Sequence, residues 1–261
     1  MEPTQTPAGR APDEKRRPRA RGIYLLPNLF TSGGLFAGFF AIIAASQGRF
    51  EAACVAIFVA AVLDGVDGRV ARLTNTQSDF GMQYDSLADL VSFGMAPALV
   101  MYYWALSAYR LDGVTAGKIG WLAAFLYAAC AALRLARFNS QVAQVDKRWF
   151  IGLASPAAAG LMASFVWTCH DMQWQGAALR HYALALTVAA ALLMVSRIRY
   201  TSFKGSGGPK GERVPFFAIV VAIAVLIALV LDPPRVLLAA GVLYALSGPV
   251  QWLWRRRGAR T

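Results

Sequence analysis

The chain has 261 residues, of which 57% are hydrophobic and 15% are charged, and its formal net charge is +12. Soluble domains carry about 25% charged residues, so this composition, with a mean hydropathy of +0.46, excludes an ordinary soluble protein and predicts a membrane protein. The positive charge does not indicate a nucleic-acid partner, because the basic residues stand between apolar segments instead of sharing one polar face. We therefore expect membrane lipids, and no nucleic acid, as partners.

Taken in chain order, the sequence begins with a basic, proline-containing stretch over residues 1–22, which predicts a disordered tail. Apolar segments then follow one another, each close to the roughly 20 residues that a helix needs to cross a bilayer. The predicted fold is an all-α membrane bundle of about eight transmembrane helices. The predicted segments are 27–46, 51–72, 82–106, 118–138, 152–169, 181–197, 214–231 and 234–254.

The distribution of basic residues predicts the orientation of this bundle. Eight spans place both termini on one side of the membrane, and 21 of the 26 lysines and arginines then fall on that side. Because an excess of basic residues marks cytoplasmic loops, both termini are expected in the cytoplasm. We predict an integral protein of the cell (inner) membrane.

Four aspartates interrupt the apolar pattern in two pairs: Asp64 with Asp67, and Asp85 with Asp89. Spacings of three and four residues place the two members of each pair on one face of a helix. A carboxylate in an apolar helix is costly and marks a functional site by default. Four such side chains form a set of hard oxygen ligands of the kind that Mg²⁺, Mn²⁺ or Ca²⁺ prefers.

The second and third segments are expected to form an antiparallel hairpin with its turn at residues 72–78, which brings the four aspartates to one depth near the cytoplasmic face. Gly68 and Ala71 follow Asp67 on nearly the same helix face, where their small side chains leave room for a phosphate. Arg72 lies one turn further on and can hold a phosphate with two hydrogen bonds. This pattern predicts a pyrophosphate site with one divalent ion and, about 3.5–4 Å away, a second.

Two other interpretations of the acidic residues compete with this one. The aspartates can pair with arginines for structural reasons, or they can serve a proton path or a cation-coupled transporter. A transporter predicts helices broken at the middle of the bilayer, or paired repeats. The four acids are instead expected at one cytoplasmic rim, and the sequence has no visible repeat.

The pattern Asp64-x-x-Asp67-Gly68-x-x-Ala71-Arg72, eight residues, Gly81-x-x-x-Asp85-x-x-x-Asp89 resembles the full signature of the CDP-alcohol phosphatidyltransferases. The resemblance implies a membrane enzyme that moves a phosphatidyl group from CDP-diacylglycerol to an alcohol and releases CMP. It also implies Mg²⁺ or Mn²⁺, with two ions, as the cofactor. Members of the family are commonly homodimers, so a homodimer is expected.

The same resemblance assigns roles within the motif. It implies that Asp64, Asp67 and Asp85 are metal ligands, and that Asp89 also faces the metals and acts as the general base. The remaining motif positions are expected to border the cytidine diphosphate; they are Gly68, Ala71, Arg72 and Gly81. A base suits this reaction, because an alcohol must lose its proton during attack.

Further segments resemble the phosphatidylserine synthase branch of that family. They are Pro27–Phe39, Tyr84–Ala98, Arg134–Asn139, Phe150–Gly160 and Ser196–Lys204. This resemblance covers about residues 23–204 and implies L-serine as the acceptor, with glycerol 3-phosphate or an inositol phosphate as the alternatives. It divides the chain into the tail (1–22), a catalytic membrane core (23–204), and two further transmembrane helices with a basic tail (205–261).

The fourth predicted segment ends in a polar group formed by Arg134, Arg137 and Asn139. An arginine fork suits the carboxylate of a serine acceptor, and Asn139 or Ser155 can orient that acceptor. The alternative is that both arginines only follow the charge rule for cytoplasmic loops. Which of the two arginines faces the site is left open by the sequence.

The first predicted segment opens with Asn28 and Thr31, which share a helix face. These side chains can cap the helix or reach the phosphates of a nucleotide. The residues alone slightly favour capping, whereas the family resemblance favours contact with the nucleotide.

Overall fold

The chain is described from a computed structural model, which places residues 25–74, 78–141, 149–201 and 216–258. Helical structure is present in each of the eight predicted segments, whereas the predicted tail 1–22 lies outside the described residues. The elements are α1 (Leu25–Ser46), α2 (Phe50–Leu73), α3 (Asp79–Asp89), η2 (Leu90–Met95), α4 (Ala96–Trp104), η3 (Leu106–Asp112), α5 (Val114–Gln141), β1 (Trp149–Ile151), α6 (Ser155–Asp171), α7 (Arg180–Val195), β2 (Arg199–Thr201), α8 (Phe216–Leu231) and α9 (Pro233–Gly258).

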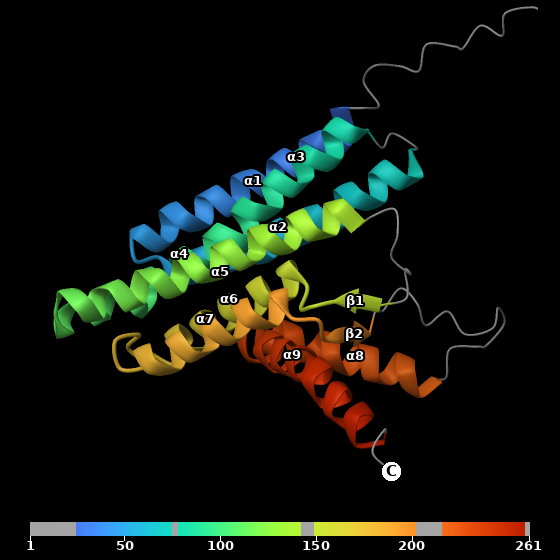
Figure 1. Cartoon of the computed structure of the whole chain (residues 1–261). Coiled ribbons are helices and arrows are strands. Elements are labelled where there is room, and N and C mark those ends of the chain that lie inside the picture. The colour runs from blue at the N-terminus through green and yellow to red at the C-terminus, as the bar shows by residue number, and fades with distance from the viewer. Residues whose placement is uncertain (1–24, 75–77, 142–148, 202–215, 259–261) are drawn as a thin grey trace, which may run out of the picture.

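The molecule is a bundle of long apolar helices (Figure 1). Within the described part of the chain, three helical stretches are long and apolar enough to cross a membrane: Pro27–Ser46, Asp79–Trp104 and Val114–Ser140. These features identify a helical membrane protein. The number of eight spans and the cytoplasmic termini stay predictions.

The small antiparallel pair β1–β2 was not expected in an all-α fold. Phe150 pairs with Tyr200 in this register, and the amide of Gly152 donates to the carbonyl of Ile198 at 2.8 Å. Gly152 has a φ of +80°, and a Cβ there would lie 2.2 Å from the Met194 carbonyl oxygen. Strands of three residues carry no detectable periodicity, so the sequence did not indicate this link between the α5–α6 and α7–α8 connections.

Small residues allow the helices around α1 to approach closely. A Cβ on Gly38 of α1 would lie only 2.7 Å from the Cα of Ser92, and the Ser92 hydroxyl donates to the Gly34 carbonyl at 3.0 Å. Buried alanines, including Ala41 and Ala60, continue this tight packing between α1 and α2. Close backbone approach through small side chains is typical of membrane helices, and here it brings α1 against both helices that carry aspartates.

The third predicted segment lies in one continuous helical stretch that contains a π-helical interruption, η2, directly after Asp89. The hydroxyl of the fully buried Tyr127 on α5 donates to the carbonyl of Phe93 within η2 at 3.2 Å. A side chain from a neighbouring helix therefore bonds to the backbone where the regular α-helical pattern is interrupted.

In α9, a side chain supplies the hydrogen bond that a proline cannot. Pro249 cannot donate to the carbonyl of Ala245, and the hydroxyl of Tyr200 on β2 donates to it at 3.1 Å. Gly248 leaves the space for this contact, since a Cβ there would lie 2.5 Å from the Tyr200 ring. Burial raises the pKa of Tyr200 to about 12, so its hydroxyl stays protonated and able to donate near neutral pH. This bond fastens the β1–β2 pair to α9.

Candidate active site

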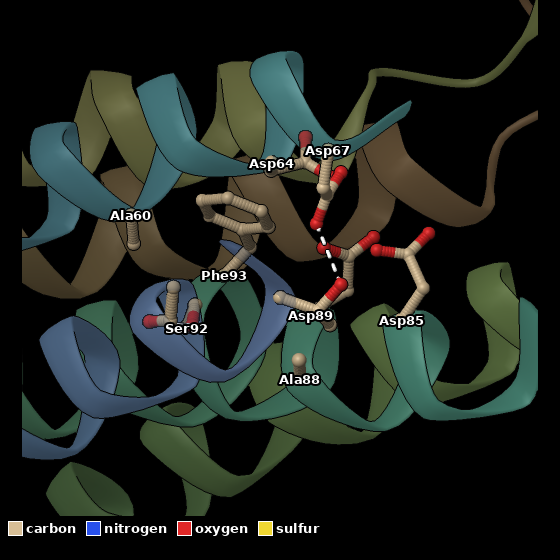
Figure 2. Close-up of a pocket in the computed structure, with 10 residues that line it drawn as sticks. Ala60, Asp64, Asp67, Asp85, Ala88, Asp89, Ser92 and Phe93 are labelled. Carbon is tan, nitrogen blue, oxygen red and sulfur yellow. Dashed lines mark hydrogen bonds between the residues drawn. The ribbon is translucent and has the colours of Figure 1, made fainter. Parts of the chain in front are cut away.

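The four aspartates of the motif converge between two facing helices, as the hairpin prediction requires. α2 supplies Asp64 and Asp67, and α3 supplies Asp85 and Asp89 (Figure 2). One carboxylate oxygen from each of Asp64, Asp67 and Asp85 lies within 4.8 Å of the other two. Carboxylates gathered so closely repel one another unless a cation lies between them. The geometry therefore supports a divalent-cation site formed by three of the four acids.

Asp89 lines the same small pocket as the other three aspartates. The pocket is enclosed by α1, α2, α3 and η2; its lining residues are Thr31, Gly34, Ala60, Asp64, Asp67, Asp85, Ala88, Asp89, Ser92 and Phe93. The carboxylate of Asp89 lies in the negative fields of the other three aspartates and in the positive field of Arg134. Asp89 thus interacts with both the acidic cluster and Arg134, the one arginine that acts on it electrostatically within the described residues.

Thr31 orients one of these carboxylates. Its hydroxyl donates to Oδ2 of Asp67 at 2.8 Å and also lies 3.1 Å from the Pro27 carbonyl oxygen. Both side chains are buried, with Asp67 5% and Thr31 6% exposed. Thr31 was expected to cap its helix or to contact a phosphate, and the structure gives it a third role as the partner of Asp67. A partner on another helix leaves no local signal in the sequence.

The other predicted nucleotide-side residues lie near the turn of the α2–α3 hairpin, in the last turns of α2, the first turn of α3 and the start of α1. A Cβ on Gly81 would lie 3.5 Å from Oδ1 of Asn28, and one on Gly68 would lie 3.6 Å from Nη1 of Arg72. Arg72 is exposed near the end of α2, and Ala71 beside it is partly buried. Because the two glycines have no side chains, the space beside the Asn28 amide and the Arg72 guanidinium stays open.

A second contact between α1 and α3 was not anticipated from the sequence. The hydroxyls of Ser32 and Tyr84 lie 2.8 Å apart, and the Tyr84 ring stacks on that of Phe80 at a centroid distance of 6.0 Å. Ser32 follows Thr31 directly and Tyr84 precedes Asp85 directly. The contact therefore holds the backbones that carry two of the pocket residues in fixed register.

Arg134 on α5 interacts electrostatically with Asp89 and also contacts the start of α6. Its Nη1 donates to the hydroxyl of Ser155 at 2.8 Å, and Ser155 is fully buried at the start of α6. Its Nε is buried and has no hydrogen-bond partner among the described residues. A buried Nε donor on a partly buried guanidinium is costly unless an anion or acceptor binds there.

The remaining predicted acceptor residues differ in their placement. Asn139 donates from Nδ2 to the hydroxyl of Ser86 at 2.9 Å, which ties the end of α5 to α3 between Asp85 and Asp89. The side chain of Arg137 makes no hydrogen bond or ion pair with another described residue. Of the two arginines, the structure therefore brings Arg134 to the acidic cluster.

Comparison with known proteins agrees with this geometry. The family model described as CDP-alcohol phosphatidyltransferase matches residues 24–195. The chain is 36% identical to the CDP-diacylglycerol–serine O-phosphatidyltransferase of Helicobacter pylori strain 26695 over 232 residues, which cover 89% of this chain and 92% of that protein.

Two further relatives match shorter stretches. The Mycobacterium bovis protein of the same name is 41% identical over 160 residues, covering 56% of this chain and 53% of its own. The archaetidylserine synthase of Methanothermobacter thermautotrophicus is 33% identical over 184 residues, covering 70% of this chain and 72% of its own. The family match spans the whole acidic motif and well over half of the chain. This chain therefore belongs to the CDP-alcohol phosphatidyltransferase family.

Proposed function

We propose that this protein transfers the phosphatidyl group of CDP-diacylglycerol to the hydroxyl of L-serine, forming phosphatidylserine and releasing CMP. The observation that carries the proposal is the group of three carboxylates within 4.8 Å in a membrane helix bundle. Membership of the family supplies the reaction class. The relatives named for serine transfer, one of which matches 89% of the chain, supply the acceptor.

The proposed cofactor is Mg²⁺ or Mn²⁺, with two ions held by Asp64, Asp67, Asp85 and Asp89. The donor set fits, because carboxylate oxygens are the ligands that these hard cations prefer. When bound, such ions neutralise the phosphate charges that develop during displacement. The Thr31 hydroxyl keeps Asp67 turned toward the cluster, in the way that residues behind metal ligands generally orient them.

The cytidine diphosphate is proposed to bind near the turn of the α2–α3 hairpin. Arg72 supplies a forked donor for a phosphate. Gly68 and Gly81 leave the phosphates room to approach the backbone, and Asn28 and Ala71 border the same space. The diacylglycerol part is proposed to remain among the apolar helices, in contact with membrane lipids.

Asp89 is proposed as the general base that takes the proton of the serine hydroxyl as this oxygen attacks the β-phosphorus. Its position suits the task, because it lines the acidic pocket and interacts electrostatically with Arg134. A base must lie within hydrogen-bond reach of the proton it removes, and an acceptor held between Arg134 and the pocket meets that condition.

Arg134, with Ser155 and Asn139, is proposed to hold the serine. The unused Nε donor of Arg134 offers a hydrogen bond to the serine carboxylate. Ser155 fixes the guanidinium in place, and Asn139 orients the acceptor from the end of α5. Arg137 is proposed as an outer contact that attracts the carboxylate from solvent.

The larger arrangement follows from the same proposal. Residues 23–204 form the catalytic core, preceded by the tail 1–22 and followed by the two helices and basic tail of 205–261. Eight spans with both termini in the cytoplasm place the active site at the cytoplasmic face of the cell (inner) membrane, where serine is available and CMP can leave. The active form is proposed to be a homodimer, as is common in the family.

An acceptor panel tests the proposal. Purified protein in detergent with CDP-diacylglycerol and Mn²⁺ or Mg²⁺ is expected to release CMP when L-serine is added, and to make phosphatidylserine. Glycerol 3-phosphate and inositol phosphate serve as the competing acceptors. CMP release with either of these, and none with serine, refutes serine as the acceptor but retains the reaction class. No release with any acceptor refutes the proposal as a whole.

A further inference from the structure

The C-terminal helix α9 reaches the acceptor side of the proposed site, although it lies beyond the segment 24–195 that matches the family model. Figure 1 shows α9 beside β2. α9 also packs along α6, where a Cβ on Gly241 would lie 3.3 Å from the Cα of Leu161. The contact of Tyr200 with Ala245 lies further along α9, close to the β1 strand that leads into α6.

These contacts fix the direction and height of α9. Gly241 is level with Leu161, and Ala245 is level with the strand pair that comes before Ser155, so α9 and α6 run antiparallel. Tyr244 is therefore level with the first turn of α6, where Ser155 accepts the hydrogen bond of Arg134. The ring of Tyr244 lies against that of Tyr200, with centroids 5.6 Å apart.

Electrostatics agrees with this position of Tyr244. The guanidinium of Arg134 interacts electrostatically with Asp89, with the hydroxyl of Tyr244 and with that of Tyr127. The hydroxyl of Tyr127 has a structural role, because Tyr127 is buried and donates to the Phe93 carbonyl. Tyr244 is only partly buried, on a helix that Tyr200 anchors through a separate carbonyl.

We infer that Tyr244 is a positioning residue for the acceptor, which acts through Arg134. The hydrogen bond from Tyr200 to Ala245 fixes the position of α9. Tyr244 then lies level with the start of α6, where Ser155 accepts a hydrogen bond from Nη1 of Arg134. The fork of Arg134 is thereby kept turned toward an acceptor carboxylate beside Asp89. This inference rests on the proposed function, since it assigns Tyr244 to the serine subsite and not to the nucleotide subsite.

The test compares Tyr244→Phe with the wild type and with Tyr182→Phe, a control at an exposed tyrosine on α7. Phenylalanine keeps the ring contact with Tyr200 and removes only the hydroxyl. The measurements are the KM for L-serine, the KM for CDP-diacylglycerol, kcat from CMP release, and the Tm. Tyr244→Phe is expected to raise the serine KM by about tenfold, the size of one hydrogen bond to a charged group. The other three quantities stay at their wild-type values, and Tyr182→Phe changes none.

Two results overturn the inference alone. One is a serine KM of Tyr244→Phe that lies within about twofold of the wild-type serine KM, when the wild type is normally active. The other is a rise of both KM values together with a lower Tm, which indicates a general packing role. A wild-type protein that releases no CMP with serine overturns the proposed function, and this inference with it.

Discussion

The hydroxyl of Thr31 on α1 donates a 2.8 Å hydrogen bond to the carboxylate of Asp67 on α2, and both residues are buried. The bond crosses between α1 and α2, which pack along each other through glycines and alanines. α1 therefore contributes to the acidic cluster although it carries no acid of its own. Its contribution is to fix the direction of one carboxylate.

Loss of that bond is expected to weaken the response to metal. Thr31→Val keeps the shape of the side chain and removes the donor, so Asp67 loses its orienting partner. Changes of this kind typically cost about 10- to 100-fold in metal affinity or activity. The measurement is the Mn²⁺ or Mg²⁺ concentration that gives half-maximal CMP release, which should rise about tenfold and return toward normal in Thr31→Ser.

Thr187→Val is the matched control for Thr31→Val. Thr187 is also fully buried, but its hydroxyl bonds to the Ala183 carbonyl within α7, away from the aspartates. Its metal response should equal that of the wild type. An unchanged half-maximal concentration in Thr31→Val means that Asp67 needs no help from α1.

The division of roles among the aspartates predicts different losses. Asp89→Asn removes the proposed base and should lower kcat by at least about 100-fold, while Mn²⁺ and CDP-diacylglycerol still bind. Asp64→Asn and Asp67→Asn should weaken both kinds of binding as well, because each removes a charged member of the three-carboxylate group. Binding is measured by titration of Mn²⁺ and by nucleotide competition.

Glu51→Gln provides the control for these charge changes. Glu51 is an exposed carboxylate in the first turn of α2, at the other end of the helix from the cluster. It should leave turnover and binding unchanged. Equal retention of metal and nucleotide in all three aspartate variants contradicts the proposed assignment.

Removal of divalent ions is expected to abolish CMP release and to lower the Tm. Four carboxylates that face one small pocket repel one another without a cation. An ion that binds only the folded protein stabilises it by about 2.7 kcal/mol at 100 times its Kd. Thermal unfolding after chelation, and after Mg²⁺ or Mn²⁺ is restored, measures the effect. Asp64→Asn should show a much smaller rise in Tm on metal addition, and an equal rise argues for binding elsewhere.

Tyr200 and Pro249 should be energetically coupled. Tyr200→Phe leaves the Ala245 carbonyl without its donor, and an unsatisfied buried polar group costs about 1–3 kcal/mol. Pro249→Ala returns an amide that can donate to the same carbonyl. Tyr200→Phe should therefore lower the Tm more in the wild-type background than in a protein that already carries Pro249→Ala. Equal effects in both backgrounds would show that the Tyr200 hydroxyl does not replace the missing amide.

Much of this molecule was predictable because the deciding signals are local. Apolar segments near helix-spanning length place helical structure in all eight predicted segments, and spacings of three and four residues put each aspartate pair on one helix face. The hairpin turn of α2 and α3 is short, so their meeting also follows from the sequence. The family signature depends on the same short spacings, and the family match bears it out.

The sequence left other features open because they join residues far apart in the chain. Spacing could not choose between Arg134 and Arg137, since both lie on one helix; the choice depends on where Ser155 packs, 21 residues away. The β1–β2 pair and the contact of Tyr200 with α9 likewise depend on the packing of distant segments.

The sequence by itself determined the helices, the acidic motif and the reaction class, because helical periodicity and motif spacing act over a few residues. Only the tertiary structure decided which side chains support the acids. The bond of Thr31 to Asp67 depends on how close α1 and α2 come. The bond of Arg134 to Ser155 and its electrostatic interaction with Asp89 depend in the same way on neighbouring helices. That closeness is set by glycine and alanine contacts between helices, which no single segment specifies.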